Sequence, residues 1–390
     1  GSPPQNWFSS HRILGYVFLG LVLAGMVAGV YGWRSGGNGE STSKPVITLE
    51  GSVWTGFGVS GAGEVSVQGD YAYVAPGEGD FQVIDIRNKN KPTNIGWIAS
   101  DFQADVRVEG KYAYLKSHIN KFGIFVVDIS DPANPRYIKP EEGGFGLTWQ
   151  APEGTIVGDY RVRNGYLYLT LRQIDVILGG EIDTTKPSTS AKSFLVLDVK
   201  DPLQIREVSR LKLDDDAFRM YLNGNRAYIG FINGGGAIVD ISNPQSPRLE
   251  GIYREKSQKS PYLLGHKGST LIMATWQPAV LHSIYGNDKY WTDNPLPEPI
   301  KLIFVDALQP SQPIRTGAYR FPESQVLPWQ AVAKDNYLYV IDQRGPSAGV
   351  YTADPKTRPR LLTFDISNQQ APKFVHQFDQ KERNLLKPYV

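Results

Sequence analysis

The sequence contains no cysteine. Disulfide bonds, thiol catalysis and thiolate metal sites are therefore excluded, although this absence does not identify a compartment. Histidine is scarce as well, because the 390 residues include only five, and these show no paired spacing such as H-E-x-x-H. A G-x-S-x-G elbow and a phosphate-binding glycine loop are also lacking. We therefore predict no metal, no cofactor and no catalytic residue.

An excess of charge of one sign is lacking too. The chain has 41 Lys and Arg against 39 Asp and Glu, so its formal net charge is only +2. Nucleic acid is bound mainly through a concentrated positive field, and we predict no nucleic-acid partner. What is abundant is Gly, Pro and Tyr, with 40, 27 and 21 residues. This composition favours short strands joined by tight turns, and it predicts an all-β protein.

A single long apolar run lies near the start of the chain. Residues 13–33, ILGYVFLGLVLAGMVAGVYGW, carry no charge, and a helix of this length spans the roughly 30 Å hydrocarbon core of a bilayer. We predict a transmembrane helix here, with a cleaved signal peptide as the alternative. His11 and Arg12 favour a cytoplasmic tail over residues 1–12. The protein is then a single-pass protein of the cell membrane, with its main domain on the periplasmic or extracellular side.

Repeats fill the rest of the chain, after a Gly- and Ser-rich linker over residues 34–45. The segment VSVQGDYAYVAPGEGDFQVIDI from Val65 matches VRVEGKYAYLKSHINKFGIFVVDI from Val106, and four further copies follow. Each copy has four short apolar runs, which is the pattern of a four-stranded antiparallel blade. Residues 46–390 are therefore predicted to form a β-propeller. The segment 46–54 resembles a spare outermost strand that pairs with the last blade, which leaves six or seven blades open.

The third run of each copy carries a resemblance to a known family. These runs read FQVIDI, IFVVDI, FLVLDV, GAIVDI, LIFVDA and LLTFDI. They are similar to the LVIVD repeat family over residues 65–380. The resemblance implies a β-propeller of bacterial and archaeal surface or envelope proteins, and it implies no defined reaction.

Residues that recur from copy to copy are expected to serve the fold. An acid ends each third run and precedes a turn, where a carboxylate can cap backbone N–H groups. Paired tyrosines two residues apart share one strand face, and they are expected to pack between blades. The glycine between the first two strands suits a hairpin that requires positive φ. The acids are Asp85, Asp128, Asp198, Asp240, Asp306 and Asp365.

Departures from the repeat are the better candidates for function. Three copies are enlarged between their second and third strands, over residues 173–192, 276–299 and 343–360. Equivalent hairpins in a ring open on the same face, together with the connections between blades. This face is rich in aromatic side chains, which often anchor protein interfaces. The predicted partner-binding residues are Phe145, Trp149, Trp276, Tyr285, Tyr290, Trp291 and Trp329.

A second candidate site is the mouth of a central channel. Alignment of the copies places five polar residues at one equivalent position, at the start of the innermost strand. They are Glu64, Asp105, Asp159, Arg219 and Gln330. Such a ring could bind a cation, a sugar or a charged side chain, or it could simply be a hydrated polar mouth.

Taken together, the anchor, the repeats and the aromatic face favour a non-enzymatic scaffold or accessory subunit of a membrane or envelope complex. Its predicted partners are the lipid bilayer, through residues 13–33, and other membrane or envelope proteins. Two alternatives stay open at this point. One is a propeller enzyme or small-molecule sensor that uses the channel mouth, and the other is a glycan-binding adhesin.

Overall fold

The computed structural model describes eleven stretches of the chain, and all of them lie within the predicted propeller. These are residues 62–76, 80–99, 103–117, 122–139, 146–173, 190–255, 261–275, 300–322, 326, 328–342 and 360–379. The predicted tail, transmembrane helix and linker, and the segment 46–54, lie outside them. Within these stretches no helix is long and apolar enough to cross a membrane.

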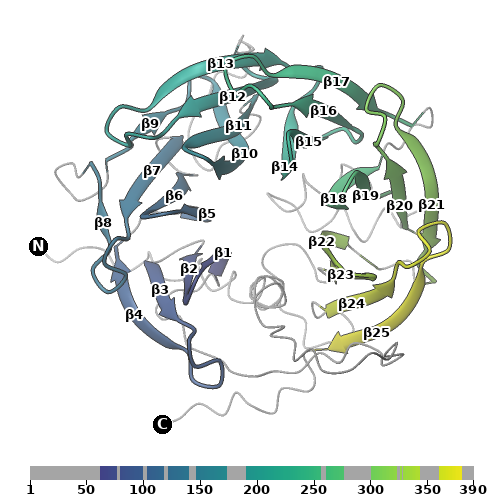
Figure 1. Ribbon diagram of the computed structural model, residues 1–390, viewed down its shortest axis with the longest axis horizontal. Helices are drawn as coiled ribbons and strands as arrows, with labels where there is room; N and C mark the ends of the chain where they lie inside the picture. Colours follow the sequence, from purple (N-terminus) through teal and green to yellow (C-terminus); the bar gives the residue numbers. More distant parts are fainter. Residues whose placement is uncertain are drawn as a thin grey trace, which may run out of the picture.

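Six antiparallel sheets follow one another along the chain and stand around a common centre (Figure 1). The first blade contains β1 (Ala62–Gln68), β2 (Tyr71–Pro76), β3 (Phe81–Asp85) and β4 (Thr93–Ile98). The second contains β5 (Gln103–Glu109), β6 (Tyr112–Ser117), β7 (Gly123–Asp128), β8 (Arg136–Tyr137) and β9 (Trp149–Gln150). The third contains β10 (Thr155–Arg163), β11 (Tyr166–Gln173), β12 (Ser193–Asp198) and β13 (Arg206–Lys212).

The remaining three blades repeat the same order. The fourth contains β14 (Ala217–Asn223), β15 (Arg226–Phe231), β16 (Gly236–Asp240) and β17 (Arg248–Tyr253). The fifth contains β18 (Tyr262–Lys267), β19 (Thr270–Ala274), β20 (Lys301–Asp306) and β21 (Ile314–Arg320). The sixth contains β22 (Pro328–Lys334), β23 (Tyr337–Asp342), β24 (Arg360–Asp365) and β25 (Lys373–Asp379). The prediction of an all-β propeller with six four-stranded blades is confirmed.

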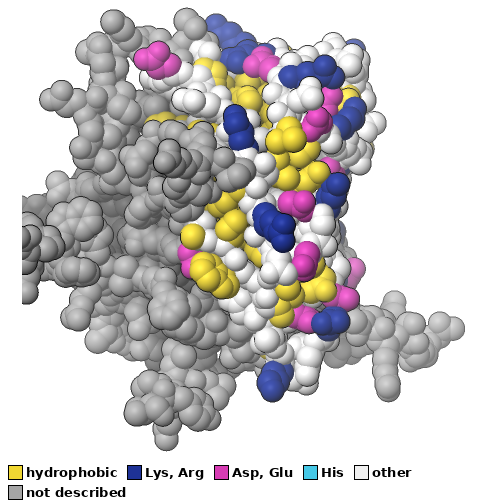
Figure 2. All heavy atoms as spheres, turned by 90° about the vertical axis from the view of Figure 1, so that its left-hand side faces the viewer, with side chains coloured by type: hydrophobic (Ala, Val, Ile, Leu, Met, Phe, Trp, Pro, Cys, Tyr) yellow, Lys and Arg dark blue, Asp and Glu magenta, His cyan; other side chains and the backbone are white. Residues whose placement is uncertain are grey.

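Each blade has its first strand at the centre of the ring and its last strand at the perimeter (Figure 1). The third strands are buried on both faces, because a neighbouring blade covers each side. This accounts for their continuous apolar sequences. The outermost strands keep an exposed face, and the exposed fraction of Trp97 on β4 is 63%. Figure 2 views the wall on the side of β4 and β8, where acidic and basic side chains are interspersed.

Apolar clusters between blades form the core. In three of the four predicted tyrosine pairs one member is buried in such a cluster, as Tyr73 is between the first and second blades and Tyr114 between the second and third. Tyr168 and Tyr228 occupy the same place at the next two junctions. The prediction that the paired tyrosines pack between blades is confirmed for these three pairs, whereas Tyr339 of the fourth pair is buried in a cluster whose described members all belong to the sixth blade. No blade could bury both of its faces alone, so the repeats stabilise one another.

The six repeated acids cap the turns that follow the third strands. Each carboxylate accepts a hydrogen bond from the backbone N–H two residues later, as Asp128 does from Ser130 at 2.8 Å. The other five bonds have lengths of 2.8 to 3.1 Å, and they join Asp85 to Arg87, Asp198 to Lys200, Asp240 to Ser242, Asp306 to Leu308 and Asp365 to Ser367. The structural reading of these acids is therefore confirmed in every blade.

Polar side chains also connect the hairpin turns of consecutive blades. Gln68, at the end of β1, accepts from the backbone N–H of Gly110 and donates to its carbonyl, at 2.9 and 2.7 Å. Gly110 has a φ of +61°, as the sequence predicted for this turn. Equivalent contacts join Glu109 to Asn164 and Gly165, Arg163 to Gly224, and Asn223 to Gly268.

The second blade departs from the repeat at its outer edge. Its fourth strand, β8, contains only two residues and pairs with the end of β7. The two-residue strand β9 pairs with the same edge of β7, at the start of that strand. Pro140 and several glycines lie between these two strands in the sequence. Because proline cannot donate to a ladder and glycine weakens a strand, the outer strand is interrupted here. Trp149 therefore lies in a strand, whereas the sequence had placed it in a connection.

Candidate functional site: the polar centre of the ring

The polar site is built on the innermost strands, at the end where the connections between second and third strands also begin. We call this end of the ring the loop face. Every innermost strand has a bulge near its start, and the predicted mouth residues Glu64, Asp105, Asp159, Arg219 and Gln330 lie at or next to it. The strand registers therefore place these five residues at equivalent positions, and their role as a channel mouth stays a prediction. The fifth blade has the apolar Leu263 at this position. Glu64 lies on β1, and its side chain is outside the described part.

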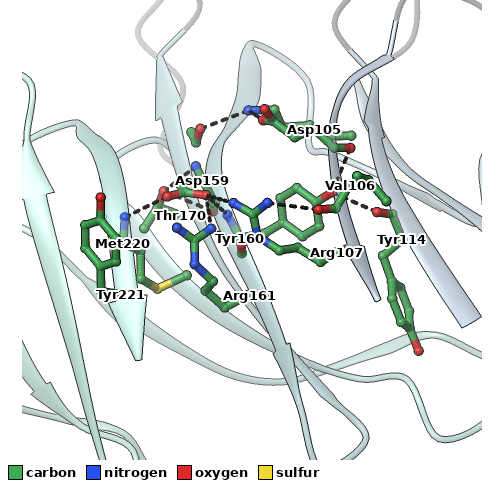
Figure 3. A network of polar contacts seen from close by, with 12 residues as sticks. Asp105, Val106, Arg107, Tyr114, Asp159, Tyr160, Arg161, Thr170, Met220 and Tyr221 are labelled. Carbon is green, nitrogen blue, oxygen red and sulfur yellow. Dashed lines mark hydrogen bonds and ion pairs between the residues drawn. The ribbon is translucent and has the colours of Figure 1, made fainter. Parts of the chain in front are cut away.

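Asp159 is the centre of a network that joins three blades (Figure 3). One carboxylate oxygen accepts a hydrogen bond from the backbone N–H of Tyr160 at 2.7 Å and another from Nη1 of Arg161 at 2.6 Å. The other oxygen accepts from the backbone N–H of Met220 in the fourth blade, also at 2.7 Å. Arg107 of the second blade approaches from the opposite side, with its Nη2 at 3.6 Å. A single buried carboxylate thus holds groups from β5, β10 and β14.

Arginine and tyrosine side chains extend this network around the centre. The guanidinium of Arg107 lies over the ring of Tyr160, 5.4 Å from its centroid, and that of Arg161 lies over Tyr221 at 5.5 Å. In both pairs the cation comes from one blade and the aromatic ring from the next. Tyr160 also donates its hydroxyl to the carbonyls of Tyr114 and Asp105, at 2.8 and 3.0 Å (Figure 3). The two arginines occupy equivalent strand positions, whereas Tyr221 lies one position later on its strand than Tyr160 does.

Asp105 has a cationic partner of its own. Lys116, which is paired with Asp105 in the β5–β6 register, forms an ion pair with its carboxylate. The same ammonium group donates to the carbonyl of Gly158 in the third blade at 3.2 Å. The Lys116 side chain is largely buried, with an exposed fraction of 7%. Asp105 and Lys116 therefore connect two blades rather than presenting free charges.

Arg219 links two blades that are not neighbours. Its guanidinium donates to the backbone carbonyl of Trp329 on β22 and stacks on the indole ring, 5.2 Å from the centroid. Because Arg219 belongs to the fourth blade and Trp329 to the sixth, the contact bypasses the fifth blade. Leu263, the apolar residue at the equivalent position there, has no charge that could compete for either partner.

An aromatic group continues the network on the fifth blade. Tyr221 donates its hydroxyl to the carbonyl of Leu264. The imidazole of His266 lies edge-on to Tyr221 and Tyr228, with centroids 5.7 and 5.5 Å apart. Burial lowers the pKa of His266, and the nearby Arg161 lowers it further, although a hydrogen bond to the Gly268 carbonyl opposes this shift. The neutral imidazole is therefore favoured here.

The geometry shows what these charges do. The carboxylate oxygens of Asp159 are occupied by backbone and guanidinium donors, and the arginines are placed on rings or carbonyls. Such saturation fixes the positions of the innermost strands. Among the described residues no group of three or more His, Asp or Glu is placed to hold a metal ion. Ligand binding at this predicted mouth stays a prediction.

The structure describes two of the seven predicted partner-binding residues. Trp149 and Trp329 are both half-buried. Trp149 packs against the apolar cluster between the second and third blades, and Trp329 packs against a cluster on each face of the sixth blade. The other residues, Phe145, Trp276, Tyr285, Tyr290 and Trp291, lie outside the described part. Partner binding by all seven stays a prediction. The cation–π contact of Trp329 had no signal in the sequence, because its partner is more than 100 residues away.

The enlarged connections lie where the sequence placed them. β11 and β12 are separated by residues 174–192, β19 and β20 by residues 275–300, and β23 and β24 by residues 343–359. The corresponding connections in the other three blades are residues 77–80, 118–122 and 232–235. Each of the six connections begins at the end of a second strand. That end pairs with the start of the innermost strand, so all six connections begin on the loop face.

Comparison with known proteins agrees with this architecture. The LVIVD repeat matches residues 61–98, 103–139 and 216–255. No curated protein sequence matches the chain. A protein from Lactobacillus plantarum has a similar structure, with a TM-score of 0.55 and 10% identity over 82% of this chain and 84% of that one.

Two further structures have similar scores. The periplasmic gluconolactonase of Pseudomonas aeruginosa has a TM-score of 0.52 and 10% identity, over 80% of this chain and 82% of its own. A functionally unknown protein from Desulfotomaculum acetoxidans has a TM-score of 0.51 and 11% identity, over 81% and 84%. At such identities the likeness establishes the fold and not the activity. The chain is a β-propeller that contains LVIVD repeats.

Proposed function

We propose that this protein is a non-enzymatic binding propeller, tethered to a membrane, whose loop face docks a membrane or envelope protein. The observation that carries the proposal is the shared position of the three enlarged connections. A blade needs only the short connections found in the first, second and fourth blades. The longer ones are not required by the scaffold, and surface loops of this kind commonly carry function.

The polar centre supports a binding role over catalysis at the channel mouth. A general acid or base needs an oxygen or nitrogen that can reach a substrate proton. The Asp159 carboxylate instead accepts three hydrogen bonds from its own chain, and Lys116 is divided between Asp105 and a backbone carbonyl. These charges are engaged in holding blades together. The connections on the loop face are then the better candidates for recognition.

The membrane tether and the class of partner rest on the sequence. Residues 13–33 are uncharged and long enough to span a bilayer, and a linker of Gly and Ser separates them from the repeats. A propeller held close to a bilayer meets other membrane or envelope proteins at high local concentration. The aromatic residues predicted on its loop face provide the side chains that commonly anchor such interfaces.

The test is copurification of the full-length protein from its native membrane in mild detergent. Three variants each replace the middle of one enlarged connection, residues 174–189, 276–299 or 343–359, with Asn-Gly, so that the buried Ile300 and the hydrogen-bonded Lys192 and Thr275 are kept. The control is Leu203→Ala in the third-blade turn on the opposite face, where the side chain is 66% exposed. We expect a stoichiometric partner that at least one connection variant loses while its melting temperature stays within a few degrees, and that the control retains.

Other outcomes overturn the proposal. A protein that elutes alone and monodisperse would refute the docking role, as would a partner retained by all three variants. Binding of a surface glycan by that lone protein would favour the adhesin, and hydrolysis of a lactone would favour an enzyme. Truncation of an anchoring tryptophan in a true interface costs about 2–4 kcal/mol, or roughly 30-fold to 1000-fold in affinity. Trp276→Ala and Trp291→Ala, combined with the binding assay, then locate the anchor.

A further inference from the structure

Positive charge exceeds negative charge among the described side chains of the polar centre. Arg107 and Arg161 meet at the same carboxylate oxygen of Asp159, with their nearest nitrogens at 3.6 and 2.6 Å. Figure 3 shows both guanidiniums turned toward this carboxylate. The other described acid of the predicted mouth, Asp105, is paired with Lys116. The centre therefore stabilises an added anion better than an added cation.

A third arginine extends this positive field into the next blade. Burial raises the pKa of the Tyr221 phenol, and the nearby Arg219 and Arg161 both oppose this shift. Arg219 lies on β14 and Arg161 on β10. Guanidiniums from two adjacent blades thus act on one phenol group at the centre of the ring.

Arg161 is held in one orientation by three contacts. Its Nη1 donates to the carboxylate of Asp159 and to the carbonyl of Tyr160, both at 2.6 Å. The guanidinium also lies over the ring of Tyr221. The side chain is 19% exposed, so it is mostly buried but still reaches solvent. A cation that is fixed in advance loses little freedom when it binds a ligand, which favours affinity.

These contacts use only one nitrogen of the Arg161 guanidinium for hydrogen bonds. Nε and Nη2 have no hydrogen-bond acceptor within the described part of the chain. Their N–H groups lie on one edge of the planar group, which can hold two oxygens of a carboxylate or phosphate side by side. Arg210 shows this geometry on the perimeter, where its Nε and Nη2 donate to the two carboxylate oxygens of Glu207 at 2.9 and 2.7 Å.

We propose that Arg161 anchors an anion-binding site at the polar centre, where its Nε–H and Nη2–H hold two oxygens of a carboxylate or phosphate group on a small molecule. Asp159 and Tyr221 position the guanidinium, and Arg107 and Arg219 supply the surrounding positive charge. A small molecule fits better than a protein surface, because the Arg161 side chain is mostly buried among innermost strands. The site is separate from the enlarged connections, and it does not depend on docking at the loop face.

Isothermal titration calorimetry of the full-length protein in mild detergent tests this proposal. The probes are acetate, citrate and inorganic phosphate, at constant ionic strength in a chloride buffer. We expect at least one probe to bind, and we expect Arg161→Lys to weaken that binding by at least about tenfold. A lysine keeps the positive charge beside Asp159 but lacks the pair of parallel donors. Arg210→Lys is the matched control, because the equivalent edge of Arg210 is already occupied by Glu207, and it should leave the affinity unchanged.

A second measurement needs no variant. Phenylglyoxal modifies accessible arginine side chains, and mass spectrometry locates the modified residues. We expect the bound probe to slow modification of Arg161. It should not slow modification of Arg206, whose side chain is 75% exposed on β13.

Each result has a definite meaning. Tighter binding of acetate or citrate assigns a carboxylate ligand, and tighter binding of phosphate assigns a phosphate ligand. Both results support the site if the probe also protects Arg161. Failure of all three probes to bind at millimolar concentrations would overturn the proposal. Binding that neither protects Arg161 nor weakens in Arg161→Lys would overturn it too, because the anion would then be held elsewhere. The three connection variants retain all residues of this site and should bind the probe normally, so loss of docking and loss of anion binding are distinguishable.

Discussion

Replacement of Asp159 by alanine tests whether the polar centre holds the ring together. The substitution removes two hydrogen bonds from backbone N–H groups, those of Tyr160 and Met220, and one from the guanidinium of Arg161. It also leaves Arg161 and Arg107 near the centre without their shared carboxylate. The side chain of Asp159 is only 11% exposed, so water replaces these contacts poorly.

The expected loss of stability follows from these contacts. A hydrogen bond to a charged group contributes about 1.5–3 kcal/mol, and breaking a buried ion pair by removing one partner costs roughly 3–5 kcal/mol. The arginines retain some exposure and can turn toward water, so the lower values apply. We expect Asp159→Ala to lower the free energy of unfolding by about 3 kcal/mol. In a domain of this size the melting temperature should fall by roughly 4–8 °C.

Thermal unfolding followed by circular dichroism measures this effect. Asp214→Ala is the matched control, because Asp214 is an exposed carboxylate in the connection between β13 and β14. It removes the same charge from the same region, and it should change stability by no more than about 0.5 kcal/mol. Equal melting temperatures for the two variants would refute a structural role for the polar centre. The carboxylate of Asp159 would then be the strongest candidate for a ligand-binding group.

Two further predictions concern acid stability and the cross-ring contact. The hydrogen bond from Arg248 holds the pKa of Asp240 at about 2, and the pKa values of Asp128 and Asp365 are also lowered by their turn bonds. The stabilisation by these ionised carboxylates is present above the ordinary carboxyl pKa near 4 and is lost as pH falls toward 2. The difference in melting temperature between wild type and Asp240→Asn should therefore close over that range. A difference that persists at pH 2 would contradict this prediction. Trp329→Ala removes both the Arg219 contact and the packing of the indole against two apolar clusters, so it should cost about 2 kcal/mol in denaturant unfolding. Trp97→Ala on the exposed wall should cost less than about 0.5 kcal/mol, and equal costs would show that neither the contact nor the packing of Trp329 stabilises the fold.

The blade pattern was predictable because its causes are local. The acid at the end of each third strand caps a backbone group two residues away, and the hairpin glycine sets a dihedral angle at its own position. Both effects repeat with the sequence, so six copies could be aligned without knowledge of the packing. The tyrosine pairs follow from the two-residue period of a strand. The turn caps, hairpin glycines and tyrosine pairs depend on residues close together in the chain, and they could therefore be predicted from the sequence.

The contacts of the polar centre were not predictable, because they join residues that are far apart in the sequence. The sequence placed Asp159 at a mouth open to ligands, and nothing near it in the chain shows that its partners include Met220, 61 residues later. The interrupted outer strand of the second blade was missed as well. There Trp149 returns to the edge of β7 after a stretch rich in Gly, and the period of the strand pattern is lost.

The polar centre also explains why charge can lie inside a ring of apolar wedges. Apolar clusters fix the distance between blades, but a flat apolar face allows one blade to slide along the next. The Asp159 carboxylate accepts from a backbone N–H of β14 and from the backbone of its own strand, so it fixes the relative height of two innermost strands. In some proteins, buried polar groups specify one register at a cost in stability. Asp159→Ala should then do more than lower the melting temperature. It should also broaden the unfolding transition, because blades that slide independently no longer unfold as one unit.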